Sequence, residues 1–130
     1  MNKTLCVAAV GLLLTATPIP AHHAFAAEYD ENKLVTVSGT VTSFKWTNPH
    51  AWLYVNGKDD GKDENGKITS WSFEMGSPGG LTRRGWVRTD LKAGDQVTLI
   101  GARAKSGTHA LWLTKVIGPD GQPMNTFEGD

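Results

Sequence analysis

The chain has 130 residues, with 13 basic and 13 acidic side chains and no formal net charge. This length corresponds to one domain. The neutral balance lacks the basic patch by which nucleic-acid-binding domains attract phosphates, so no nucleic-acid partner is expected. The 15 glycines and 5 tryptophans are many for so short a chain, and they favour glycine-punctuated β-structure.

Residues 1–21 have the three parts of a secretory signal peptide. Lys3 supplies the positive charge, and an apolar run at 5–16 follows that is too short to span a bilayer. Cleavage is predicted after Ala21, with Ala26 as the alternative site. We therefore expect a periplasmic or secreted protein with no membrane span after cleavage. The single cysteine, Cys6, would be removed, and the mature domain would be stabilised by its core alone.

The next segment, 22–33, shows no clear period and is expected to form an N-terminal arm. A strand is predicted over 34–46, where apolar and polar residues alternate from Val35 to Val41. The apolar positions then shift by one residue to Phe44. Such a slip indicates a β-bulge near 42–43 and a strand that bends, as a small barrel requires.

Four further strands are predicted by alternation and turn residues, at 51–57, 68–76, 96–104 and 109–118, with a short helix around 81–84. Trp71, Phe73 and Met75 would share one face of the third strand. The order of elements matches a small, five-stranded, antiparallel OB-like β-barrel with one helix between strands 3 and 4. A β-sandwich is the alternative. The barrel domain would span 34–118, followed by a polar tail at 119–130.

Histidines supply the first candidate site. If cleavage follows Ala21, the α-amine and ring of His22 can chelate one metal ion, and His50 can add a third nitrogen. Such a set suits Cu(II), and His23 is an alternative ligand. Zinc is a weaker option. The competing interpretation is that His22 and His23 are plain polar residues and that His50 caps the turn after Pro49.

A face rich in tryptophan and arginine supplies the alternative site. OB-folds bind ligands on one face through aromatic platforms and nearby cations. Such a face could bind a glycan, a small anionic ligand or an envelope protein, although the tryptophans could equally fill the core. The candidate residues are Trp46, Asn48, Trp52, Arg83, Arg84 and Trp86.

No catalytic constellation stands out, and no enzymatic activity is expected. Histidine 50 could pair with Glu74 or Asp95 if the fold brings them together. The charged segment 58–67 does not fit a calcium-binding loop, because Gly61 and Ser72 fall where acidic ligands are required. It is predicted to be a solvated hairpin loop.

Four segments, "HHAFAAEYD", "WTNPHAWLYV", "RRGW" and "LKAGDQVTLIG", together resemble an exported bacterial family of small β-rich domains of unknown function. The resemblance covers nearly all of the expected mature chain. It implies no activity, but it makes His22, His23, Asn48, Pro49, His50 and Trp86 motif positions. The layout is more loosely similar to periplasmic bacterial OB-fold proteins.

Overall fold

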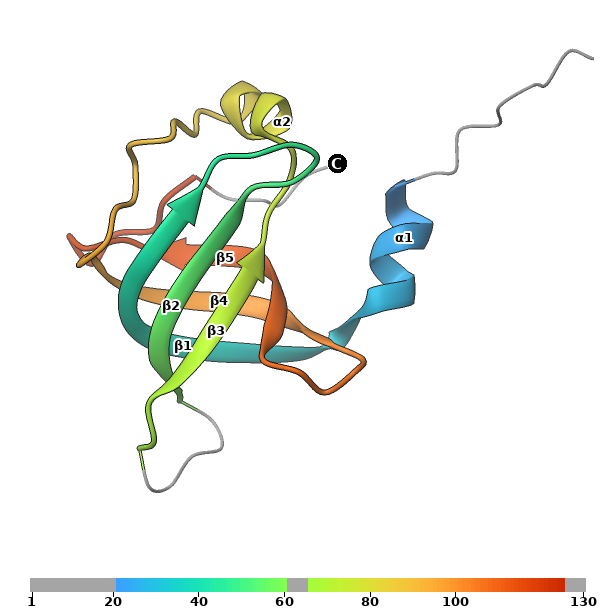
Figure 1. Ribbon diagram of the computed structural model, residues 1–130, viewed down its shortest axis with the longest axis horizontal. Helices are drawn as coiled ribbons and strands as arrows, with labels where there is room; N and C mark the ends of the chain where they lie inside the picture. Colours follow the sequence, from blue (N-terminus) through green and yellow to red (C-terminus); the bar gives the residue numbers. More distant parts are fainter. Residues whose placement is uncertain (1–20, 61–65, 126–130) are drawn as a thin grey trace, which may run out of the picture.

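The computed structural model describes residues 21–60 and 66–125, and for 21–24 it describes the backbone alone. Apart from Ala21, the signal peptide expected at 1–21 lies outside these residues. The elements in chain order are α1 (Ala21–Glu28), β1 (Tyr29–Lys45), β2 (Trp52–Asp59), β3 (Thr69–Glu74), α2 (Pro78–Arg83), β4 (Gln96–Ala104) and β5 (Ala110–Ile117). Figure 1 shows the five strands wrapped around one another, with α2 at one end.

The strands form a closed barrel in the order β1-β2-β3-β5-β4. This arrangement confirms the predicted all-β, OB-like barrel. The expectation that every pair is antiparallel was wrong for β3 and β5, which run parallel where 72–74 meets 110–112. The reason is geometric, since an odd number of strands in a closed ring cannot alternate direction all the way round.

The first strand begins earlier than predicted. The arm expected at 22–33 is instead the helix α1 followed directly by the start of β1 at Tyr29. The pairing of β1 with β4 shifts register between Asp30 and Leu34, and this irregularity breaks the two-residue alternation by which strands are recognised. A second shift, between Val41 and Ser43 in the pairing with β2, confirms the predicted bulge.

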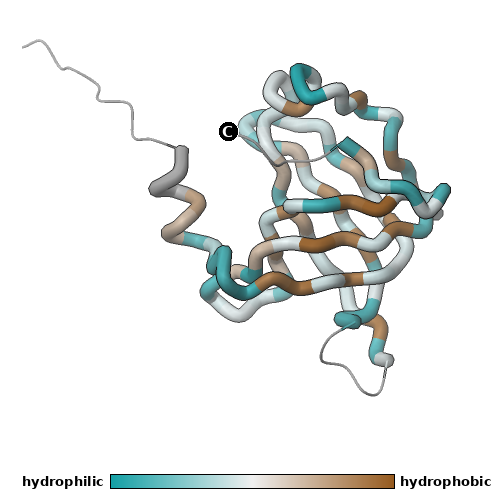
Figure 2. The backbone as a smooth tube through the Cα atoms, turned by 180° about the vertical axis from the view of Figure 1, so that it is seen from behind, coloured by the Kyte–Doolittle hydropathy of each residue, from teal (hydrophilic) through white to brown (hydrophobic). Residues whose placement is uncertain are grey.

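The barrel interior holds the apolar face of every strand. Trp71, Phe73 and Met75 are all buried, as expected for one face of β3. In Figure 2 the hydrophobic segments follow the strands, and hydrophilic segments lie mostly at their ends. The predicted polar tail partly folds back, because the backbone of Met124 bonds to Val116 and its side chain packs against the core.

Helix α2 covers one end of this core. Ser77 caps its N-terminus by accepting a hydrogen bond from the Gly80 N–H at 3.1 Å, and Pro78 follows in the first turn. Leu81 turns into the barrel and is buried. The helix begins before the predicted 81–84, because the Ser77 cap and the proline in its first turn start it at Pro78.

The close approach of β1 and β2 depends on glycine. Gly39 lies opposite Gly57, and a Cβ at Gly39 would come within 2.2 Å of the Asn56 carbonyl oxygen. A backbone atom cannot move aside without displacing the strand pair. Gly39 is therefore required by packing at the most tightly coiled part of β1.

Replacing Gly39 with alanine is expected to lower the free energy of unfolding by about 1–3 kcal/mol, because the added methyl group overpacks the strand pair. Urea denaturation measures the change. Gly76→Ala is the matched control, since the nearest atom to its new methyl group is Leu81 Cδ2 at 4.0 Å. Equal losses in the two variants would contradict the packing role of Gly39.

Candidate functional site

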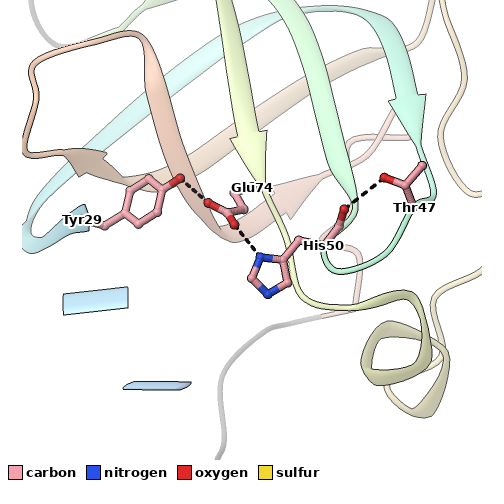
Figure 3. Close-up of polar contacts among 4 residues, drawn as sticks. All are labelled: Tyr29, Thr47, His50 and Glu74. Carbon is pink, nitrogen blue, oxygen red and sulfur yellow. Dashed lines mark hydrogen bonds and ion pairs between the residues drawn. The ribbon is translucent and has the colours of Figure 1, made fainter. Parts of the chain in front are cut away.

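A buried carboxylate, Glu74, is the centre of the polar cluster shown in Figure 3. Glu74 is the last residue of β3, and only 8% of its surface is exposed. The hydroxyl of Tyr29 donates a short hydrogen bond to Oε2, and Nδ1 of His50 lies 2.5 Å from Oε1. Both carboxylate oxygens are thus engaged, which is the condition for burying such a group.

Three separate parts of the chain supply this cluster. Tyr29 opens β1, Glu74 closes β3, and His50 lies in the β1–β2 loop. The loop contains a cis bond between Asn48 and Pro49. The Thr47 hydroxyl donates to the His50 carbonyl at 3.2 Å, so the backbone of His50 has a partner within the loop while its ring meets Glu74.

Aromatic rings cover the cluster on the outside of the barrel. Trp112 of β5 lies edge-on to His50, with ring centroids 5.7 Å apart, and it also contacts Tyr29. Phe25 of α1 packs against Trp112 at 5.5 Å. Tyr29, Ala102 and Ala104 are buried beneath these rings and form a second, smaller apolar cluster. This outer cluster attaches α1 to the barrel.

Burial makes Tyr29 a hydrogen-bond donor at all ordinary pH values. Desolvation raises the pKa of its hydroxyl well above the usual value near 10, and the hydrogen bond to Glu74 raises it further. The hydroxyl stays neutral and keeps its proton for Glu74. The carboxylate in turn accepts from His50.

The predicted metal ligands are only partly described. His22 and His23 lie in α1, but their side chains fall outside the described part of the structure. His50 is half-exposed and pairs with Glu74, one of the two partners considered from the sequence. The other, Asp95, bonds instead to Lys92 at 2.8 Å. Within 21–60 and 66–125, no group of three or more His, Cys, Asp or Glu side chains is placed to hold a metal ion.

The residues of the alternative face separate into different environments. Trp86 is fully buried in the main core, so its predicted role on a binding face was wrong, and Trp46 packs against the same core. Arg83 is exposed on α2, and Arg84 ends that helix. Asn48 is exposed in the β1–β2 loop, and Trp52 is half-buried on β2.

Trp52 belongs to a different surface from the arginines. Its ring stacks on Tyr54 with centroids 6.4 Å apart, and Lys45 lies over the Tyr54 ring at 5.2 Å. Tyr54 was not among the residues selected from the sequence. Its signal was its position two residues after Trp52, which places both rings on one face of the strand.

Tyr29 was also missed. No apolar period surrounds it, because the strand is irregular there, and its partner Glu74 lies 45 residues away. Glu74 gave no signal either. It follows Ser70 and Ser72 on the outward face of the alternating strand β3, where a charged side chain is expected to be solvated, so its burial depends on partners that only the fold supplies.

Comparison with known proteins assigns the chain to a family. Residues 9–111 match the model of a family of unknown function, DUF6152. The chain belongs to DUF6152. The match includes Tyr29, His50 and Glu74. It confirms the expectation of an uncharacterised family, and it carries no activity.

Among solved structures, the DUF6152 chain is similar to the mitochondrial single-stranded DNA-binding protein Rim1 of S. cerevisiae. The two share 9% identity with a TM-score of 0.47, over 66% of this chain and 92% of the other. At this level the likeness carries no argument about ligands. No curated protein gives a significant match.

Across the described residues, no helix is long and apolar enough to cross a membrane.

Tyr29→Phe is expected to lower the free energy of unfolding by about 1–3 kcal/mol at pH 7, because one oxygen of the buried Glu74 loses its partner. The difference from the wild type should shrink above about pH 10. There the unfolded tyrosine ionises while the folded one, with its raised pKa, stays neutral, so the wild type loses stability as pH rises.

Chemical denaturation of both proteins from pH 7 to 11 measures this difference. Tyr54→Phe is the control for tyrosine removal, since Tyr54 makes no contact with Glu74. A difference between wild type and Tyr29→Phe that stays constant over the whole range would contradict the burial of a neutral Tyr29.

Proposed function

We propose that the protein is exported, is cleaved after Ala21 and then binds one Cu(II) ion through the new N-terminus and His50. The ligands would be the α-amine and ring of His22 together with the ring of His50, with His23 beside them. The role would be copper storage or delivery in the periplasm or outside the cell, with an envelope protein as recipient and no catalysis.

The observation that carries this proposal is the bond between Glu74 and Nδ1 of His50. A carboxylate can only accept, so a neutral His50 carries its proton on Nδ1 and has its lone pair on Nε2. Metal-binding histidines are commonly oriented by a carboxylate in this way. His50 is also 40% exposed at its side chain, which leaves the ring accessible to an ion.

The position of α1 supports a contribution from the N-terminus. Phe25 packs on Trp112, and Trp112 packs on His50. His22 precedes Phe25 by three residues, which is about one turn of helix or roughly 5 Å along the axis. A chain that starts at His22 would keep the Phe25 contact, whereas a chain cut after Ala26 would lose it together with both histidines.

Copper binding is tested by titrating the processed protein, with its start at His22 verified by intact mass, and recording calorimetry and EPR spectra. The wild type should bind one Cu(II) with nitrogen hyperfine structure. His50→Ala should weaken binding by about tenfold or more, since one of three nitrogen ligands is lost. His109→Ala is the matched control and should bind as the wild type does.

Glu74→Gln separates orientation of the ring from ligation. An amide can present its oxygen or its nitrogen to Nδ1, so the tautomer of His50 is no longer fixed. Affinity should fall by about tenfold while the EPR nitrogen pattern persists. Equal affinities of wild type and His50→Ala would exclude the proposed site.

A second function is favoured by the stacked pair of Trp52 and Tyr54. Two nearly parallel rings with an interplanar angle of 24° form a platform, and hydroxyls of Ser70 and Ser72 lie on the neighbouring strand. We propose this surface as the glycan-binding alternative, in which the histidines would be structural.

Trp52→Ala should then reduce binding to an array of bacterial cell-wall oligosaccharides by about fivefold or more, because the sugar would lose the larger ring of the platform. His50→Ala should have no effect on that binding. Val87→Ala, which removes an exposed apolar side chain elsewhere, serves as the control. Unchanged glycan binding by Trp52→Ala would contradict this second function.

A further inference from the structure

The end of the barrel opposite α2 contains a hollow that neither proposed site uses. In Figure 1 this is the end at which β2 ends, β3 begins and the β4–β5 loop lies. The hollow has a volume of about 410 Å³ and is bordered by the start of β1, the end of β2, the start of β3 and the β4–β5 region. Its volume matches a small organic molecule.

The floor of the hollow is a fixed aromatic and cationic unit. Trp71 is nearly fully buried, and its indole N–H donates to the Gly57 carbonyl at 3.3 Å. The guanidinium of Arg103 lies over the Trp71 ring, 5.3 Å from its centroid, and donates to the Gly107 carbonyl at 3.0 Å. His109 meets the same indole edge-on at 4.7 Å.

Arg103 has capacity for a further partner. A guanidinium has five N–H donors, and the carbonyl of Gly107 takes one of them. Within the described part of the chain, Arg103 forms no ion pair with a carboxylate. A half-buried, stacked guanidinium with a free donor edge is well suited to bind a carboxylate or a phosphate in a forked geometry.

The charge around the hollow favours an anion. Lys33, Lys67 and Arg103 line it, against one carboxylate, Asp59. Lys67 and Asp59 have other partners, so Arg103 is the cation on which the site depends. Lys33 adds a 74% exposed ammonium group at the rim, near Asp30.

An apolar wall lies beside these cations. Leu34 is 60% exposed, which is unusual for a large apolar side chain in a strand, and it lines the same hollow as the Trp71 ring. We infer that this end of the barrel binds a small organic anion whose carboxylate or phosphate meets Arg103 and whose apolar part packs against the exposed side chain of Leu34, beside the covered Trp71.

Phenyl phosphate is a suitable probe because it combines both parts. In ¹H–¹⁵N NMR titrations it should shift the Trp71 indole and the His109 and Gly107 amides in a saturable way. Inorganic phosphate should bind at least about threefold more weakly, since it lacks the apolar part, and benzyl alcohol should bind weakly for lack of charge.

Arg103→Gln should weaken the binding of phenyl phosphate by about fivefold or more. Lys33→Gln should weaken it by only about twofold, because the Lys33 charge is exposed and screened by solvent. Lys115→Gln removes an exposed charge on another face and is the matched control. A thermal melt verifies that Arg103→Gln is folded. Lys33→Gln, whose ion pair is with the neighbouring Asp30, gives a second measurement of the contribution of charge to binding.

Absence of saturable shifts at Trp71 and His109, or equal losses in Arg103→Gln and Lys115→Gln, would overturn the inference. Equal binding of phenyl phosphate and inorganic phosphate would overturn the role of the apolar wall. Because none of these residues contacts His50, a failure here is independent of copper binding.

Discussion

The barrel depends on β1 pairing with two different strands. Residues 37–40 are paired on one side with β2 and on the other with β4, so this short segment closes the ring. A strand can serve both neighbours only if it coils strongly, and the bulge after Val41 together with Gly39 allows this. The other four strands each form one side of the barrel, so closure of the ring depends less on their lengths than on the coiling of β1.

The same coiling explains why a carboxylate is buried outside the main core. Once β1 has turned round the barrel, its first residue, Tyr29, lies on the outer surface next to β4 and β5, where Glu74 ends β3. The outer apolar cluster then excludes water from one side of Glu74. Replacing it by an apolar residue would be less costly than removing one partner, since a buried charge with a missing hydrogen bond is the least stable arrangement. Its presence therefore favours a functional reason for the His50 contact.

Most of the fold could be predicted from the sequence, because four of the five strands alternate regularly and the bulge is visible as a shift of parity at Phe44. The start of β1 could not, since its register is irregular between Asp30 and Leu34. An odd number of strands in a closed ring requires one parallel pair, but its assignment to β3 and β5 depends on the strand order that the structure shows. For the site, the motif at residues 48–50 predicted His50. Tyr29 and Arg103 could not be predicted, because they come next to Glu74 and Trp71 only when the barrel closes.

The two ends of the barrel differ in a way that bears on function. The end at α2 is filled by Leu81 and Trp86, both fully buried. At the opposite end Trp71 is nearly fully buried, and Arg103 lies over its ring at the border of the hollow. The helix thus covers one end of the barrel, whereas the proposed sites lie at the opposite end and on the outer wall. None of the proposed copper ligands lines the hollow at Arg103, so a copper ion at His50 and an anion at Arg103 could be bound at the same time without competing for any side chain.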